Sequence, residues 1–184
     1  MIKNRKAFIV GIKGLRLKKK EIFFLKKYKP WGIILFERNI QSIKQVKNLT
    51  TEIKKLFSDI NYPILIDQEG GTVSRLNNIL ISSNFSGEYF GNKFLKKNHN
   101  FQNLLDIYIN QISFLLKYLG ININNAPVLD IRRKCSEIIV GNRSFSKNKI
   151  KVSKIGKFFI RKFHDKKIAT VIKHIPGHGL AKVD

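Results

Sequence analysis

The chain has 184 residues, 43% of them hydrophobic and 11% aromatic, which suffices for one sizeable core, and no apolar run approaches the roughly 18 residues of a membrane-spanning helix. Its single cysteine, Cys135, excludes a disulfide within the chain and favours the reducing cytoplasm, while the basic N-terminal stretch is expected to hold a first strand rather than a signal peptide. The formal net charge of +24 comes mostly from lysines spread along the whole chain without a basic arm, which favours compositional drift over a specific nucleic-acid partner.

Short apolar runs alternate with longer amphipathic segments, which predicts alternating strands and helices. In chain order we expect a strand at Ala7–Ile12, a helix at Lys18–Tyr28, a strand at Gly32–Phe36, a helix at Ser42–Phe57, a strand at Pro63–Asp67, an irregular region at Asn77–Asn100, a helix at Phe101–Leu119, a strand within Asn124–Ile131, a helix at Ile150–Lys166 and a strand at Ala169–Lys173.

Nearly continuous hydrophobic strands between helices of this length are typical of a parallel sheet that is covered on both faces. Two α/β architectures fit, the open doubly wound sheet and the (β/α)8 barrel, and both bind ligands at the carboxyl ends of their strands. No Gly-x-Gly-x-x-Gly motif follows the first strand, which counts against a dinucleotide-binding fold. A complete barrel needs roughly 250 residues, so residues 1–184, taken as a single domain, supply about five of eight strand–helix units and leave an open sheet edge.

The segment Asp67–Gly71 carries two carboxylates, Asp67 and Glu69, that an extended strand points to the same side, and it ends in a glycine pair that permits a tight turn. Arg75, four residues further on, presents a fixed fork of hydrogen-bond donors. Carboxylates that accept and a guanidinium that donates suit a polyhydroxylated ligand at a strand end. A buried structural ion pair beside a glycine turn explains the same pattern equally well.

Two further segments give weaker signals. Asp130 ends the apolar run Asn125–Asp130, where it either positions a ligand or caps the next segment, and the pattern favours the structural role. Arg143 lies in the loop Gly141–Phe145, where it either brings a cation to the site or is a solvated surface arginine.

The segment Lys173–Gly179 gathers a lysine and two histidines at a strand end. His174 and His178 are four residues apart, a metal-ligand spacing when both lie on one helix face, but the proline and glycine between them argue against a helix. No third ligand is evident, so we expect no metal. Hydrogen bonding of a polar ligand by Lys173 and His174 is the favoured interpretation, and structural histidines are the alternative.

Five segments follow one another along the chain. They are Gly-Ile-Ile-Leu-Phe-Glu-Arg-Asn (Gly32–Asn39), Ile-Asp-Gln-Glu-Gly-Gly-Thr-Val-Ser-Arg-Leu (Ile66–Leu76), Ala-Pro-Val-Leu-Asp (Ala126–Asp130), Val-Gly-Asn-Arg-Ser-Phe (Val140–Phe145) and Lys-His-Ile-Pro-Gly-His-Gly (Lys173–Gly179). Together, and in this order, they resemble the β-N-acetylhexosaminidases of glycoside hydrolase family 3. The resemblance spans nearly the whole chain. It implies the N-terminal part of a (β/α)8 catalytic barrel that removes terminal β-linked N-acetylglucosamine, in bacteria usually from a muropeptide of cytoplasmic cell-wall recycling, and it implies no cofactor.

The same resemblance assigns roles to residues. By their positions in the motifs, the sugar-binding residues are Asp67, Arg75, Arg143, Lys173 and His174. The family retains anomeric configuration through a glycosyl-enzyme intermediate, in which a carboxylate attacks and a second group shuttles the proton. In this branch the shuttle is a loop histidine oriented by an aspartate two residues before it. Asp184 is similar to that aspartate, and the histidine and the nucleophile are expected beyond it.

Three functions remain as alternatives. The first is a glycosidase of which residues 1–184 are the N-terminal part, either of a longer chain or of an enzyme split between two genes, and which is active only together with the C-terminal part that carries the histidine and the nucleophile. The second is an inactive truncated remnant, or half of a split enzyme, that at most binds sugar. The third is a basic protein that binds polyanions, whose affinity would fall steeply with salt. The order of the motifs favours the first two.

Overall fold

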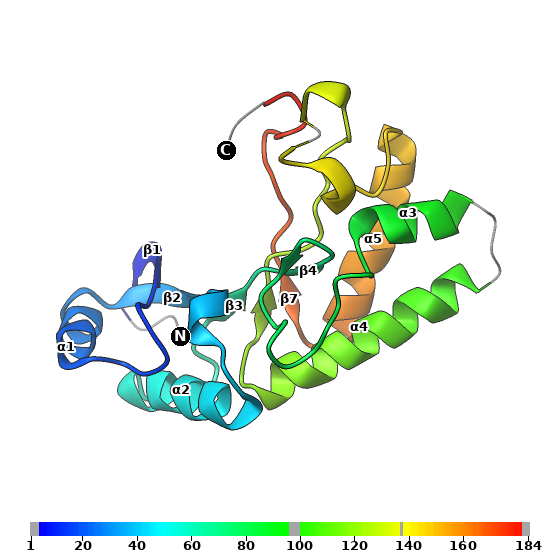
Figure 1. Ribbon diagram of the computed structural model, residues 1–184. Helices are drawn as coiled ribbons and strands as arrows, with labels where there is room; N and C mark the ends of the chain where they lie inside the picture. The colour runs from blue at the N-terminus through cyan, green and yellow to red at the C-terminus, as the bar shows by residue number, and fades with distance from the viewer. Residues whose placement is uncertain (1–3, 96–99, 137, 182–184) are drawn as a thin grey trace.

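The computed structural model describes residues 4–95, 100–136 and 138–181, and its central feature is a sheet of five parallel strands (Figure 1). The strands are β1 (Lys6–Gly11), β2 (Pro30–Leu35), β3 (Ile64–Ile66), β6 (Ile123–Asn124) and β7 (Ala169–Thr170). Their order in the sheet is β1-β2-β3-β6-β7, which is also their order along the chain. All neighbouring pairs are parallel.

This sequential order distinguishes the two architectures that the sequence left open. A doubly wound sheet reverses its direction of growth at a switch point, which places helices on both faces. Here each new strand is added on the same side of the previous one, so right-handed crossovers place every connecting helix on one face. One covered face and one face without helices describe the wall of a (β/α)8 barrel. The chain therefore forms a partial barrel, the second of the two architectures.

The four predicted helices are present, with ends close to those expected. They are α1 (Lys19–Tyr28), α2 (Ile43–Leu56), α4 (Phe101–Tyr118) and α5 (Lys149–Asp165). Ser42 caps α2 by accepting from the backbone N–H of Gln45, and Asn148 caps α5 by accepting from two N–H groups of its first turn. After α4, Gly120 adopts a positive φ of 78°, which turns the chain toward β6.

The segment expected to be irregular contains a helix, α3 (Gly87–Leu95), which the sequence pattern missed. Before it, β4 (Gln68–Gly70) and β5 (Val73–Ser74) form an antiparallel hairpin. Hairpin and helix are both inserted between β3 and its covering helix α4. Figure 1 shows α3 lying beside α4 and α5, and contacts join each pair of these three helices.

The fourth and fifth strands are shorter than expected. The ladder between β6 and β7 stops after Asn124 and Thr170, then resumes as a single bridge between Val128 and Lys173. Pro127 interrupts it because proline has no N–H to donate, although its carbonyl still accepts from Lys173 N at 3.3 Å.

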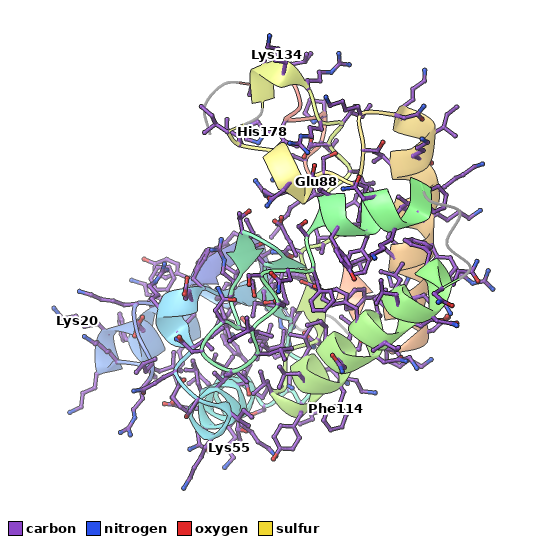
Figure 2. All side chains as sticks on the ribbon, turned by 45° about the vertical axis from the view of Figure 1, so that its right-hand side comes forward. Lys20, Lys55, Glu88, Phe114, Lys134 and His178 are labelled. Carbon is purple, nitrogen blue, oxygen red and sulfur yellow. The ribbon has the colours of Figure 1, made fainter. Side chains whose placement is uncertain are left out.

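Apolar side chains fill the space between the sheet and its helices, while the two ends of the sheet stay open. At β1, Ile9 is 43% exposed, and beyond β7, Val171 is 43% exposed. Lysine side chains project from several parts of the surface, among them the labelled Lys20 and Lys55 in Figure 2. Within the described ranges, no helix has the length and apolarity needed to cross a membrane.

The core that α5 contributes can be tested at Phe163, whose side chain is fully buried. Phe163→Ala is expected to lower the free energy of unfolding by about 3–5 kcal/mol, because it leaves a cavity beneath the helix. Phe114→Ala is the matched control, since Phe114 is 73% exposed, and it should change stability by no more than about 0.5 kcal/mol. Urea unfolding measures both, and equal costs would contradict the position of α5.

Candidate functional site

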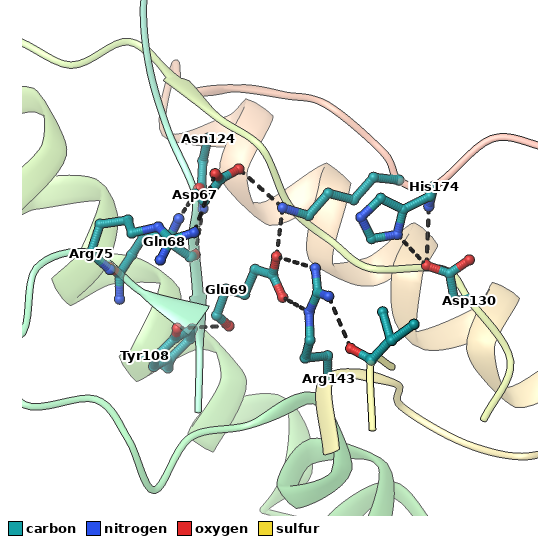
Figure 3. A network of polar contacts seen from close by, with 11 residues as sticks. Asp67, Gln68, Glu69, Arg75, Tyr108, Asn124, Asp130, Arg143 and His174 are labelled. Atoms are coloured by element: carbon teal, nitrogen blue, oxygen red, sulfur yellow. Dashed lines mark hydrogen bonds and ion pairs between the residues drawn. The ribbon is translucent and has the colours of Figure 1, made fainter. Parts of the chain in front are cut away.

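Polar side chains from distant parts of the sequence meet at the carboxyl ends of the parallel strands (Figure 3). Asp67 directly follows β3 and Glu69 lies in β4, while Lys173 follows β7. Arg143 ends the short 3-10 helix η3 (Gly141–Arg143). In barrels of this type, the loops at this end of the strands carry the ligand site.

Glu69 is the centre of this group. Its Oε2 accepts from Arg143 Nε at 2.8 Å, and its Oε1 accepts from Arg143 Nη2 at 2.9 Å, which is a two-point carboxylate–guanidinium pair. Lys173 Nζ lies 2.5 Å from Glu69 Oε1 and 3.0 Å from Asp67 Oδ1, so one ammonium joins both carboxylates. Arg143 Nη1 also donates to the carbonyl oxygen of Ile139 at 3.0 Å, which helps to fix the orientation of the guanidinium group.

Asp67 also faces Arg75 across the hairpin. Arg75 Nη2 is 3.8 Å from Asp67 Oδ2, and Arg75 Nε is buried without a hydrogen-bond partner among the described residues. Gln68 sets this geometry, because its buried side-chain oxygen accepts from the backbone N–H of Arg75 at 3.1 Å. The positive φ of Gly70, 87°, lets the chain reverse between the two strands.

Asp130, whose side chain is fully buried, holds the segment Lys173–Gly179 in place. Its Oδ2 lies 2.5 Å from His174 Nδ1 and accepts from His174 N at 3.1 Å, while its Oδ1 accepts from His178 N at 2.6 Å. The two imidazole rings are 5.1 Å apart, edge to face. The structural role that the pattern favoured for Asp130 agrees with these contacts.

The site is half-buried and nearly balanced in charge. Exposed fractions of its side chains run from 5% for Glu69 to 34% for His174. Two carboxylates, Asp67 and Glu69, form ion pairs with three cations, Arg75, Arg143 and Lys173. Ion pairs buried to this degree give little net stability, because desolvation offsets their attraction. The arrangement is therefore better explained by a requirement to hold these groups in place.

Helix α3, which the sequence pattern did not predict, packs against the loop that carries Arg143 and so helps to position it beside Glu69. Two glycines one turn apart, Gly87 and Gly91, lie against the backbone of residues 143–145. A Cβ at Gly87 would lie 2.1 Å from the carbonyl oxygen of Arg143, and one at Gly91 would lie 1.7 Å from that of Phe145. Only glycine permits this approach. The two glycines four apart were the signal in the sequence, but glycine lowers helix propensity and so concealed the helix.

The structure brings together all five residues that the resemblance assigned to sugar binding. Arg143 is not the solvated arginine that its loop position alone suggested, because it is 16% exposed and paired with Glu69. Asp184 lies outside the described residues. In the part of the chain that the structure describes, no group of three or more His, Cys, Asp and Glu side chains is placed to hold a metal ion.

A partial α/β barrel with carboxylates and cations at its strand ends is typical of enzymes that act on polar small molecules. The chain belongs to glycosyl hydrolase family 3, since the model of that family's N-terminal domain matches residues 5–184. It is 32% identical over 168 residues to beta-hexosaminidase A of Pseudoalteromonas piscicida, covering 87% of this chain and 27% of the relative. It is 30% identical to the beta-hexosaminidase of Haemophilus influenzae, covering 97% and 49% respectively.

Solved structures agree with the fold. NagZ of Neisseria gonorrhoeae, in complex with N-trifluoroacetyl-D-glucosamine, matches 95% of this chain with a TM-score of 0.83 and 30% identity. A family-3 β-N-acetylglucosaminidase of a Paenibacillus species matches 97% with a TM-score of 0.82 and 30% identity. The chain spans 52% and 33% of these two proteins, and about half or less of the curated relatives named above.

The close packing of α3 gives a direct test. Gly91→Ala is expected to destabilise the fold by about 1–3 kcal/mol, because the new methyl group forces α3 away from the carbonyl oxygen of Phe145. Gly14→Ala is the matched control, since a Cβ there meets no atom within 4 Å. Urea unfolding compares the two, and a neutral Gly91→Ala would contradict the contact that positions residues 143–145.

Tyr108 contacts Glu69 and affects how the stability of the fold depends on pH in the alkaline range. Burial, aided by the negative charge of Glu69, raises the pKa of Tyr108 above its ordinary value of 10.0. The folded state thus holds the phenolic proton more tightly than the unfolded chain does. This contribution to stability is complete below pH 10 and is lost as the pH rises above it.

Tyr108→Phe should therefore make the free energy of unfolding fall less steeply above about pH 10. The variant also loses the hydrogen bond from the phenol to the carbonyl oxygen of Glu69, at 3.3 Å, so its stability near neutral pH should drop by about 1 kcal/mol. Urea midpoints measured on both sides of pH 10 give the two slopes. Identical slopes for the variant and the unchanged protein would show that Tyr108 does not titrate as described.

Proposed function

We propose that residues 1–184 are a single domain, the N-terminal part of the catalytic barrel of a glycoside hydrolase that removes terminal β-linked N-acetylglucosamine with retention of configuration. The observation that carries this proposal is the network in which Lys173 joins Asp67 to Glu69 while Glu69 holds Arg143. The relatives support it, because those named above are beta-hexosaminidases and one solved relative holds a glucosamine derivative. A substrate from cell-wall muropeptides, recycled in the cytoplasm, is part of the proposal.

The chemistry of the side chains suits a sugar. The Asp67 carboxylate can accept from two neighbouring hydroxyls, because carboxylate oxygens have several acceptor positions and Arg75 approaches it only to 3.8 Å. Arg75 and Lys173 donate to hydroxyl oxygens, and His174 offers an imidazole that is 34% exposed. Arg143, held in a fixed orientation by Glu69, presents its guanidinium edge beside them.

Hydrolysis needs two further groups. A retaining glycosidase uses a nucleophilic carboxylate and a separate proton-transfer group. We propose that Asp184 orients a histidine two positions beyond it, and that this histidine and the aspartate nucleophile belong to the C-terminal part of the barrel, on the same or on a partner polypeptide. In this proposal residues 1–184 contribute the sugar-binding groups, and cleavage requires the C-terminal part of the barrel as well.

Sugar binding can be tested with N-acetylglucosamine itself. Asp67→Ala and Arg75→Ala should each weaken affinity tenfold or more, since a hydrogen bond to a charged group contributes about 1.5–3 kcal/mol. Asp165→Ala and Arg161→Ala are matched controls on the exposed surface of α5 and should bind normally. Isothermal titration calorimetry measures affinity, and thermal unfolding confirms that each variant is folded.

The salt dependence separates this function from polyanion binding. Affinity for an uncharged sugar should change little between low and high salt, whereas counterion release makes polyanion affinity fall steeply. No saturable response to N-acetylglucosamine in the unchanged protein would overturn the proposal that these residues hold sugar. Binding only to polyanions would assign a function to the charge of +24 instead.

A further inference from the structure

Asp130 occupies a position that sugar contact does not explain. Its side chain is fully buried, so it does not face a ligand, yet it is surrounded by donors. Oδ2 forms hydrogen bonds with both the imidazole Nδ1 and the backbone N–H of His174, and Oδ1 accepts from the backbone N–H of His178. All these partners belong to the segment that carries Lys173 and His174.

The carboxylate decides which nitrogen of His174 carries a proton. An ionised carboxylate only accepts hydrogen bonds, and Asp130 Oδ2 lies 2.5 Å from Nδ1, so Nδ1 must be the protonated nitrogen. In a neutral imidazole the other nitrogen, Nε2, is then an acceptor. His174 is 34% exposed, so Nε2 can accept from a ligand hydroxyl while the opposite edge of the ring stays fixed.

Asp130 also connects the loop that carries Arg143 with the segment that carries Lys173. Its backbone carbonyl oxygen accepts from the hydroxyl of Ser144 at 2.6 Å, next to Arg143. Its side chain holds the segment that follows Lys173. A displacement of Asp130 would therefore move a cation on each side of Glu69.

We infer that Asp130 is a positioning residue, which sets His174 in the Nδ1–H tautomer and fixes residues 174–178 so that Nε2 faces the sugar. The identity of the ligand rests on the proposed function. The tautomer does not, because it is a property of this chain alone.

The tautomer can be observed directly. In protein labelled with ¹⁵N-histidine, the ring nitrogen shifts of His174, identified by their loss in His174→Gln, distinguish a protonated Nδ1 from an unprotonated one. In the neutral imidazole of the unchanged protein we expect Nδ1–H and an unprotonated Nε2. An Nε2–H tautomer in the unchanged protein would overturn the inference, whatever the protein binds.

Asp130→Asn tests the cause, because the amide keeps the shape but presents one oxygen and one donor in place of two acceptors. We expect the tautomer of His174 to shift toward Nε2–H and the affinity for N-acetylglucosamine to fall about tenfold. Asp165→Asn makes the same change of charge at an exposed position and should alter neither. If Asp130→Asn is unfolded, the tautomer of the unchanged protein still decides the inference.

The outcomes separate the inference from the proposed function. Sugar binding and a His174 tautomer that are both unchanged in folded Asp130→Asn would overturn the positioning role. An Nδ1–H tautomer that is lost in Asp130→Asn, in a protein that binds no sugar, would support the positioning role and contradict the proposed function. A loss of affinity with no change of tautomer would show that Asp130 acts on the backbone alone and would overturn the assignment to His174.

Discussion

The carboxylate of Glu69 lies between two cations that come from distant parts of the chain, and the site depends on this contact. Glu69 is 5% exposed, and its oxygens are engaged by Arg143 and Lys173. Loss of both cations would leave a buried charge uncompensated, which is far more costly than the small net gain of forming the pairs, and loss of one leaves Glu69 dependent on the other. The hairpin, the loop that ends in Arg143 and the segment after β7 are therefore held in one relative position.

Several local features exist to make that contact possible. Gln68 anchors the hairpin through the backbone N–H groups of Arg75 and Leu76, which directs Asp67 and Glu69 toward the same side. Helix α3 brings the backbone near Arg143 close enough only because glycines face it. Asp130 fixes the other side through the segment that begins with Lys173. Gln68, the glycines of α3 and Asp130 each fix the position of the backbone, which suits a site that is formed before a ligand binds.

The sequence predicted most elements because their signals are local. Apolar residues at helical spacing predicted α2, α4 and α5, and short apolar runs predicted the strands of the parallel sheet. Helix α3 was missed because its glycines, which serve tertiary packing, oppose its propensity. The partners of Glu69 were not predictable from spacing, since Arg143 is 74 residues away along the chain. Motif resemblance selected residues that the structure brings together, but it did not show that Glu69 is central to them or that Asp130 holds His174.

The site lies near β7, an edge strand of the described sheet. Lys173 and His174 follow β7, the last strand of the sheet, and Val171 beside them is 43% exposed. Among the described residues, those that line the site lie on the β3 and β6 side, and no strand follows β7 in the sheet. Glycosidic bond cleavage depends on charges that act in a site from which water is largely excluded. In the function that we propose, these residues recognise the sugar, and the chemistry requires further polypeptide at the edge of β7.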